Sequence, residues 1–202
     1  DVVFLALPHK TTAKVVLEML DAGYAGRIVD MSGAFRLRDA GLYEKFYGVP
    51  HPRPSMLTDG SFVYGMPELN RAAIAKAKYV ASPGCFATTI ALGLYPLAKA
   101  GLLAGPVQTV ASTGSSGSGA IPVIGTHHPL RASNLRTYKP LDHQHIPEIA
   151  QTLAGVGAKD LALEFVPVSA PLPRGIFATS FVTVPAAVTK DQLRDAWKTT
   201  FA

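Results

Sequence analysis

The sequence of 202 residues predicts an α/β fold, and three features of its hydrophobic pattern support this class. A buried strand over residues 1–7 is followed by a helical pattern and then by a short buried strand over residues 27–30. A third short strand, over residues 79–81, leads directly into another helical pattern. Strands that alternate with helices at this spacing form βαβ units, so we expect a parallel sheet in the first part of the chain.

The other elements follow from local signals. Apolar residues at helical spacing between residues 15 and 20 indicate the first helix, and Gly23 is its expected stop. Residues 36–70 are rich in Pro, Gly and charge, so we expect irregular connections there. After the helix that follows Cys85, residues 107–111 are a strand candidate.

Two more strands and a helix are expected near the end of the chain. Residues 161–168 and 176–184 have strand patterns, whereas residues 120–147 look irregular. Thr189 and Gln192 have the spacing of a capping box, with Thr189 as the N-cap of a final helix.

The chain is expected to contain two domains that meet at Cys85. Residues 1–84 are interpreted as part of a doubly wound nucleotide-binding domain, and residues 85–202 as an α+β domain. The chain opens on a strand without an initiator Met and stops within a helical pattern. We therefore expect it to be the middle of a longer protein, the alternative being a complete domain whose first strand is terminal.

Composition excludes several classes of protein. The chain is 48% hydrophobic and 16% charged, which is typical of globular proteins. Its net charge of +5 is spread along the chain, so nucleic-acid binding is poorly supported. We find no signal peptide and no apolar run long enough to cross a membrane. The single cysteine rules out an internal disulfide and suits the reducing cytoplasm.

Cys85 is the most informative residue. It follows Pro83 and Gly84 and precedes an apolar helical pattern, which places its thiol at the start of a helix. Unpaired N–H groups and the helix dipole favour a thiolate there and can hold an oxyanion. Cys85 is thus a candidate nucleophile, although a buried structural cysteine would give the same local pattern.

A cysteine nucleophile needs a proton-transferring partner, and histidines occur near each other in the second half. His143 and His145 alternate in a segment that, if extended, would place both rings on one face. With His127 and His128 they could be imagined as metal ligands, but no zinc-binding motif is present and we expect no metal.

Three further segments could bind anions or a nucleotide. The Gly-Ser loop 112–119 follows a strand but matches neither the phosphate-binding P-loop nor the dinucleotide fingerprint. Ser32 and Arg36 follow the second strand, at the sheet edge where doubly wound folds bind ligands. Arg174 lies just ahead of a strand and, like Arg36, could pair with a carboxylate or phosphate.

Seven short segments, in this order and over nearly the whole chain, resemble the N-acetyl-gamma-glutamyl-phosphate reductase family. They are Ala6-Leu-Pro-His9, Asp30-Met-Ser-Gly-Ala-Phe-Arg36, Tyr64-Gly-Met-Pro-Glu-Leu69, Ser82-Pro-Gly-Cys85, Ser115-Ser-Gly-Ser-Gly119, Tyr138-Lys-Pro140 with His143-Gln-His145-Ile-Pro-Glu148, and Pro173-Arg-Gly-Ile176. The family's glycine-rich dinucleotide fingerprint and its closing strands have no counterpart here.

The resemblance implies a glyceraldehyde-3-phosphate dehydrogenase-like architecture, in which residues 1–84 are a partial NADP-binding domain and residues 85–202 a catalytic and dimerisation domain with a mixed sheet. It implies Cys85 as nucleophile and His143 as acid and base. The remaining residues that it implies are listed here: for substrate Arg36, His145, Arg174 and Ser32, and for NADP Pro8, Ser115, Ser116, Gly117 and Gly119. A homo-oligomer, either a dimer or a tetramer, is also implied.

The activity implied is NADPH-dependent reduction of N-acetyl-glutamyl 5-phosphate to the 5-semialdehyde, through a cysteine thioester, in arginine biosynthesis. Three alternatives stay open. The substrate could be a carrier-protein-bound aminoadipyl or glutamyl phosphate. The chain could be a non-catalytic binding module with an inert Cys85, or a cysteine hydrolase that needs no nicotinamide cofactor.

Overall fold

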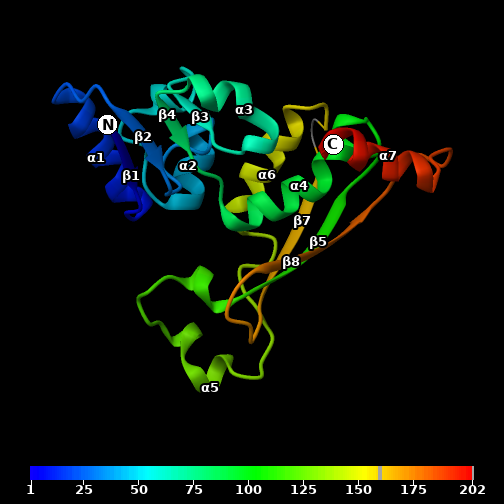
Figure 1. Ribbon diagram of the computed structural model, residues 1–202. Coiled ribbons are helices and arrows are strands. Elements are labelled where there is room, and N and C mark those ends of the chain that lie inside the picture. The colour runs from blue at the N-terminus through cyan, green and yellow to red at the C-terminus, as the bar shows by residue number, and fades with distance from the viewer. Residues whose placement is uncertain (159–160, 202) are drawn as a thin grey trace. The chain divides into compact units, whose positions relative to one another are not determined.

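The computed structural model describes residues 1–158 and 161–201, which form two compact units. The first unit is Asp1–Gly84 and the second is Cys85–Ala202. Each unit contains its own sheet of four strands, and Figure 1 shows strands and helices in both units. Each unit also has its own hydrophobic core. The α/β class is therefore confirmed, with a parallel sheet in the first unit and a mixed sheet in the second.

The first sheet is parallel throughout. Its strands β1 (Val2–Leu5), β2 (Arg27–Asp30), β4 (Tyr79–Ala81) and β3 (Phe62–Tyr64) lie side by side in that order. The register pairs Leu5 with Asp30 and Asp30 with Ala81, so these three strands end at one edge of the sheet. Helix α1 (His9–Asp21) connects β1 to β2 and buries Ala13 and Val16 in the core.

The first strand is less buried than the sequence predicts. Val2 is 51% exposed and Phe4 is 66% exposed, whereas Leu5 is buried. The reason is that β1 is the edge strand of its sheet and only alternate side chains face the core. Continuous apolar composition therefore misled the prediction of a fully buried strand here.

Residues 36–70 are more regular than expected. They contain α2 (Ala40–Tyr47), the 3-10 turn η1 (Pro54–Leu57), β3 and the start of α3 (Pro67–Lys76). Helix α2 has ordinary end signals: Asp39 accepts a hydrogen bond from the Leu42 N–H at 2.8 Å, and Gly48 ends the helix with a φ of 71°. The sequence contains these end signals, but its high Pro and Gly content led to the prediction of irregular structure.

The second sheet is mixed and has the order β6-β7-β5-β8. The central strands β5 (Val107–Thr113) and β7 (Leu163–Ser169) are parallel, and Thr113 lies opposite Ser169 where both end. The outer strands β8 (Ile176–Val182) and β6 (Arg136–Thr137) are antiparallel to their neighbours.

Helices α4 (Cys85–Lys99) and α6 (His145–Ala154) pack against each other and form one core with the sheet. That core includes Phe86, Ile149 and Phe165. Side chains on the opposite face stay exposed, among them Val110 at 45%, Phe177 at 73% and Phe181 at 64%. The side chains of β5 and β8 thus alternate between a face of the sheet that the helices cover and a bare face that carries exposed apolar groups.

Between β5 and β6 the chain makes a long excursion, which holds the 3-10 turns η2 (Ser115–Ser118) and η3 (Ile124–Thr126) and the single turn α5 (His128–Arg131) (Figure 1). The prediction of irregular structure to residue 147 is wrong at its end, because α6 begins at His145.

Helix α7 (Lys190–Phe201) ends the second unit. It opens with the expected capping box: the Thr189 N–H donates to Gln192 Oε1 at 2.8 Å, and the Gln192 N–H donates to Thr189 Oγ1 at 3.3 Å. In the part of the chain that the structure describes, no helix combines the length and the apolar character needed to cross a bilayer.

Candidate active site

Cys85 is the first residue of α4, as the sequence indicates, and it is exposed. The Thr89 hydroxyl donates a hydrogen bond to the Cys85 carbonyl at 3.1 Å, which closes the first turn. A thiolate at this position would lie at the positive end of a helix of 15 residues. Exposure also makes the thiol accessible to a substrate, which a purely structural cysteine would not require.

His143 is buried among aromatic rings, with only 3% of its surface exposed. Its ring centroid lies 5.3 Å from that of Phe86, which directly follows the nucleophile candidate, and 5.9 Å from that of Tyr138. The ring centroid of Phe165, on β7, lies 5.4 Å from that of His143. The ring pairs meet edge to face, an arrangement that aromatic quadrupoles favour. His143 is thereby held beside the start of α4.

The environment keeps His143 neutral. Burial, together with a smaller effect from the positive charge of Lys139, lowers the pKa of His143 to about 4. The His145 N–H donates to His143 Nδ1 at 3.2 Å, so the neutral ring carries its proton on Nε2. At neutral pH His143 therefore offers a hydrogen-bond donor at Nε2.

His145 lies close to His143, although not for the predicted reason. The expectation was an extended segment with both rings on one face, whereas His145 begins α6 and has helical neighbours. The two ring centroids are nevertheless only 4.8 Å apart, and His145 is 6% exposed. The turn that leads into α6 brings the rings together.

Tyr138 is a member of the site that the prediction did not name as a site residue. Burial is the main reason that the pKa of Tyr138 is raised to about 12; the charge of Cys85 contributes to the rise and that of Arg131 opposes it. The position of Tyr138 just before the histidine pair was the available sequence signal.

Main-chain hydrogen bonds to β7 fix this segment. The Tyr138 N–H donates to the Pro167 carbonyl at 3.2 Å, and the Leu141 N–H donates to the Phe165 carbonyl at 2.9 Å. Between these bonds, Lys139 and Leu141 have φ values of 43° and 60°, which non-glycine residues rarely adopt. The tight path of the backbone delivers Tyr138 and His143 to the same side of the segment.

The Gly-Ser loop is docked against the residues around Arg174. The N–H groups of Ser115 and Ser116 donate to the carbonyls of Leu172 and Pro173 at 2.8 and 3.0 Å. Gly114 is required there, because a Cβ at this position would lie 2.6 Å from the Arg174 nitrogen. These two N–H groups are engaged within the fold, so a nucleotide would have to use other groups of the loop, such as those of Gly117 and Gly119.

Pro8, Ser32 and Arg36 belong to the first unit, where they follow β1 and β2 at the carboxyl edge of the parallel sheet. Ser32 is buried, and its N–H donates to Asp30 Oδ1 at 2.7 Å. Arg36 Nε donates to the Ser82 carbonyl at 2.6 Å, and its Nη2 donates to the Met31 carbonyl at 3.1 Å. The predicted site residues are therefore divided between the two units.

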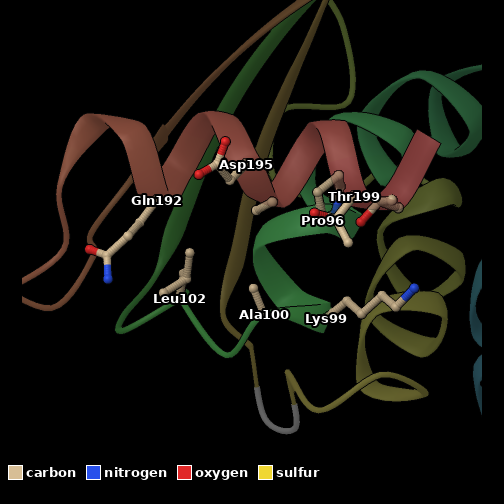
Figure 2. Close-up of a pocket in the computed structure, with 9 residues that line it drawn as sticks. Pro96, Lys99, Ala100, Leu102, Gln192, Asp195 and Thr199 are labelled. Carbon is tan, nitrogen blue, oxygen red and sulfur yellow. The ribbon is translucent and has the colours of Figure 1, made fainter. Parts of the chain in front are cut away.

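Neither a metal cluster nor the pocket between α4 and α7 adds to this site. Among the described residues, no three His, Cys, Asp or Glu side chains gather as metal ligands would. Figure 2 shows a pocket of about 430 Å³ between α4 and α7, lined by Pro96, Lys99 and Asp195 among others. It lies at the far end of α4 from Cys85 and contains none of the predicted site residues.

Comparison with known sequences agrees with this division of the chain. Residues 1–77 match the family described as semialdehyde dehydrogenase, NAD binding domain, and residues 85–202 match semialdehyde dehydrogenase, dimerisation domain. A LysW-L-2-aminoadipate 6-phosphate reductase of Deinococcus radiodurans is 44% identical over 92% of this chain and 51% of its own length. An N-acetyl-gamma-glutamyl-phosphate reductase of Pseudomonas entomophila is 41% identical over 91% of this chain and 53% of its own length.

The chain spans about half the length of these curated relatives. Among solved structures, aspartate semialdehyde dehydrogenase II of Vibrio cholerae has a TM-score of 0.67 at 15% identity, over 98% of this chain and 60% of its own. That likeness shows the shared fold. Because the second-unit match alone covers more than half of the residues, this chain belongs to the semialdehyde dehydrogenase family.

Proposed function

We propose that this chain supplies the catalytic centre of an NADP-dependent reductase that converts an acyl phosphate to an aldehyde through a thioester on Cys85. The observation that carries the proposal is the position of Cys85 at the start of α4, with His143 packed against the adjacent Phe86 and Tyr138 packed against His143. As the substrate we propose N-acetyl-glutamyl 5-phosphate, which would place the reaction in arginine biosynthesis.

The first half of the mechanism forms the thioester. The Cys85 thiolate attacks the carbonyl carbon, a C–S bond forms, and the C–O bond to the departing phosphate breaks. N–H groups at the start of α4, together with the Nε2–H of His143, would donate to the oxyanion of the tetrahedral intermediate. A thioester is formed because its carbon accepts hydride, whereas a free carboxylate does not.

The second half reduces the thioester. When NADPH is bound, it supplies the hydride for the thioester carbon. The C–S bond then breaks, the aldehyde leaves, and Cys85 returns as thiolate. The overall reduction takes up one proton, and we assign its transfer to His143. A bound phosphate dianion would raise the pKa of the buried imidazole and so make it a better proton carrier.

Some of the residues present fit a nicotinamide cofactor. Ala6, Leu7 and Pro8 are exposed where β1 ends, at the sheet edge where doubly wound folds bind nucleotides. We assign Pro8 to this site, along with the loop residues Ser115, Ser116, Gly117 and Gly119. For Ser115 and Ser116 the contribution would come from the hydroxyls, since their N–H groups are engaged.

The substrate contacts are assigned with the same proposal. His145 adjoins His143, and Arg174 is exposed beside the Gly-Ser loop. Ser32 and Arg36 would act from the first unit, although Arg36 already donates two hydrogen bonds to main-chain carbonyls. The contribution of Arg36 to binding would therefore depend on its charge.

A carrier-bound aminoadipyl phosphate is the second candidate substrate, and the relative from Deinococcus radiodurans favours it. The chemistry at Cys85 would be the same, since only the group behind the acyl phosphate differs. We also propose a homo-oligomer, on the basis of the dimerisation-domain match and the bare face of the second sheet. We place the reaction in the cytoplasm, where a thiolate nucleophile stays reduced.

The proposal is tested first by the pH dependence of Cys85 alkylation with iodoacetamide, in the wild type and in His143→Ala. We expect the Cys85 thiol to have a pKa below the ordinary value of about 8.5. We also expect this pKa to differ between the wild type and the variant. An unreactive thiol, or one with an ordinary titration in both proteins, would contradict a preorganised nucleophile.

Turnover in the whole enzyme is the second test. Cys85→Ser should abolish reduction, and His143→Asn should slow it by roughly two to four orders of magnitude, the usual scale of general acid–base catalysis. His128→Asn, at an exposed position of α5, is the matched control. A panel of acetylated and carrier-bound acyl phosphates would then separate the two candidate substrates.

A further inference from the structure

Arg131 ends the single turn α5, and its guanidinium reaches back to the carboxyl ends of the two central strands. Nη1 donates to Ser169 Oγ at 2.5 Å. Nη2 donates to the carbonyls of Thr113 and Ala170 at 3.3 and 3.0 Å. Because Thr113 and Ser169 are opposite each other where β5 and β7 end, one side chain joins the excursion to both strands.

The positive charge of Arg131 is not paired with a carboxylate. All three of its acceptors are neutral, and its Nε is buried with no hydrogen-bond partner among the described residues. No ion pair in the described part of the chain involves Arg131. The fold therefore holds the Arg131 cation in one orientation without neutralising it. An unpaired charge of this kind lowers the stability of the fold, so its presence suggests a functional use.

Both Arg131 and Tyr138 form hydrogen bonds to β7, and these bonds give the position of the Arg131 charge relative to Tyr138. Arg131 contacts Ser169, and the Tyr138 N–H binds the carbonyl of Pro167, two residues earlier on the same strand. Two residues along a strand span about 6.6 Å. The Tyr138 ring lies 5.9 Å from that of His143, and the His143 ring lies 5.3 Å from that of Phe86, the residue that follows Cys85.

We propose that Arg131 is a positioning residue of the active site, whose fixed, uncompensated positive charge favours the Cys85 thiolate and attracts the anionic acyl phosphate toward it. The hydrogen bonds to Ser169, Thr113 and Ala170 hold the guanidinium in place, and the charge acts through space. The inference rests on the proposed function, because it takes Cys85 to be the nucleophile.

The test compares two alkylating reagents of similar size, anionic iodoacetate and neutral iodoacetamide, on Cys85. Both react with the thiolate, so the ionised fraction cancels in the ratio of their rates and the ratio measures the local preference for an anion. At an intermediate dielectric a unit charge close to the site changes such a ratio about fivefold. We therefore expect Arg131→Gln to lower the iodoacetate-to-iodoacetamide ratio about fivefold at low ionic strength.

Three further variants separate charge from structure. Arg131→Gln retains an amide that can donate to a strand carbonyl, and thermal unfolding checks that it folds. Arg131→Lys keeps the charge and should keep most of the ratio, and Ser169→Ala removes one hydrogen bond but not the charge. Arg194→Gln, on α7 and 71% exposed, makes the same change in net charge away from the site. Neither Ser169→Ala nor Arg194→Gln should change the ratio.

An unchanged ratio in Arg131→Gln would overturn the inference, whatever happens to its stability. An equal fall in Arg131→Lys would also overturn it, because geometry rather than charge would then set the preference. If Arg131→Gln does not fold, Arg131→Met replaces it with the same expected fall. A wild-type thiol that reacts with neither reagent would instead refute the proposed function, so the two failures are distinguishable.

Discussion

The main-chain N–H of His145 donates a hydrogen bond to Nδ1 of His143 at 3.2 Å, so the backbone at the start of α6 sets the tautomer of the buried imidazole. No side chain is needed for this contact. Substitution of the His145 side chain should therefore leave the tautomer of His143 intact, while the rings of Phe86 and Phe165 keep its plane.

Acid should destabilise the protein partly through His143. Its pKa is about 4 when folded, against an ordinary 6.5, so the unfolded chain binds a proton that the folded state does not. Stability from this group is complete above pH 6.5 and falls as the pH drops, by about 3 kcal/mol near pH 4. His143→Gln should flatten this part of the profile in urea titrations from pH 7 to 4. A slope as steep as that of the wild type would contradict the assignment, and exposed His128→Gln is the control.

Lys139 should tune His143. Its positive charge adds to burial in lowering the pKa of His143, so Lys139→Met should raise that pKa toward its ordinary value. NMR titration of the imidazole protons measures this directly. Lys139→Arg keeps the charge and should leave the titration unchanged. A downward movement in Lys139→Met would show that the lysine does not face the ring.

Arg36 should matter for stability as well as for binding. Its guanidinium links the carbonyls of Met31 and Ser82, and hydrogen bonds from a charged group contribute about 1.5 to 3 kcal/mol each. We expect Arg36→Met to lower the free energy of unfolding by about 3 kcal/mol, measured by chemical denaturation. Arg71→Met, at an exposed position of α3, should cost little. Equal stability of the two variants would show that the links carry no net energy.

The bare face of the second sheet should mediate self-association. Phe177 and Phe181 are 73% and 64% exposed on the edge strand β8, and such apolar patches mark interfaces. The double variant Phe177→Ser with Phe181→Ser should sediment as a smaller species than the wild type. Leu42→Ser on α2, which removes a different exposed apolar group, should not. An unaltered oligomer would place the interface elsewhere.

The capping box of α7 offers a local test of stability. Thr189→Ala removes the hydroxyl that accepts from the Gln192 N–H, and loss of an N-cap typically costs about 1 kcal/mol. Thermal unfolding should show a lower midpoint. Thr199→Ala, on the exposed surface of the same helix, should not destabilise because alanine is the better helix former. A loss shared equally by both variants would argue against the cap.

Local signals in the sequence were sufficient where the determinant itself is local. The start of α4 follows from Pro83 and Gly84, and the capping box at Thr189 has the predicted bonds. The α/β class follows from the alternation of strands with helices. Helix α2 could also have been found, since Asp39 and Gly48 are standard end residues. A bias toward reading Pro-rich and Gly-rich sequence as irregular hid it.

Relationships made by tertiary structure could not be predicted in this way. Arg131 gives no local sign that it will reach Thr113 and Ser169, because those acceptors come together only when β5 and β7 pair. The exposure of Phe4 depends on β1 being an edge strand, which strand order decides. The engaged N–H groups of Ser115 and Ser116 depend on a turn far along the chain.

The pairing of β5 also determines when the site comes into existence. Its first residue, Val107, pairs with Leu163 and Val182, so the central strand has no sheet neighbour until the chain has been synthesised well beyond it. Helices form within about a microsecond, whereas distant strand pairing is far slower. A nascent chain would therefore carry the helix of Cys85 before His143 and Arg131 have been placed. Under the proposed function, the Cys85 thiol would meet its catalytic partners only in the last stage of folding, and a misfolded copy would carry the cysteine without them.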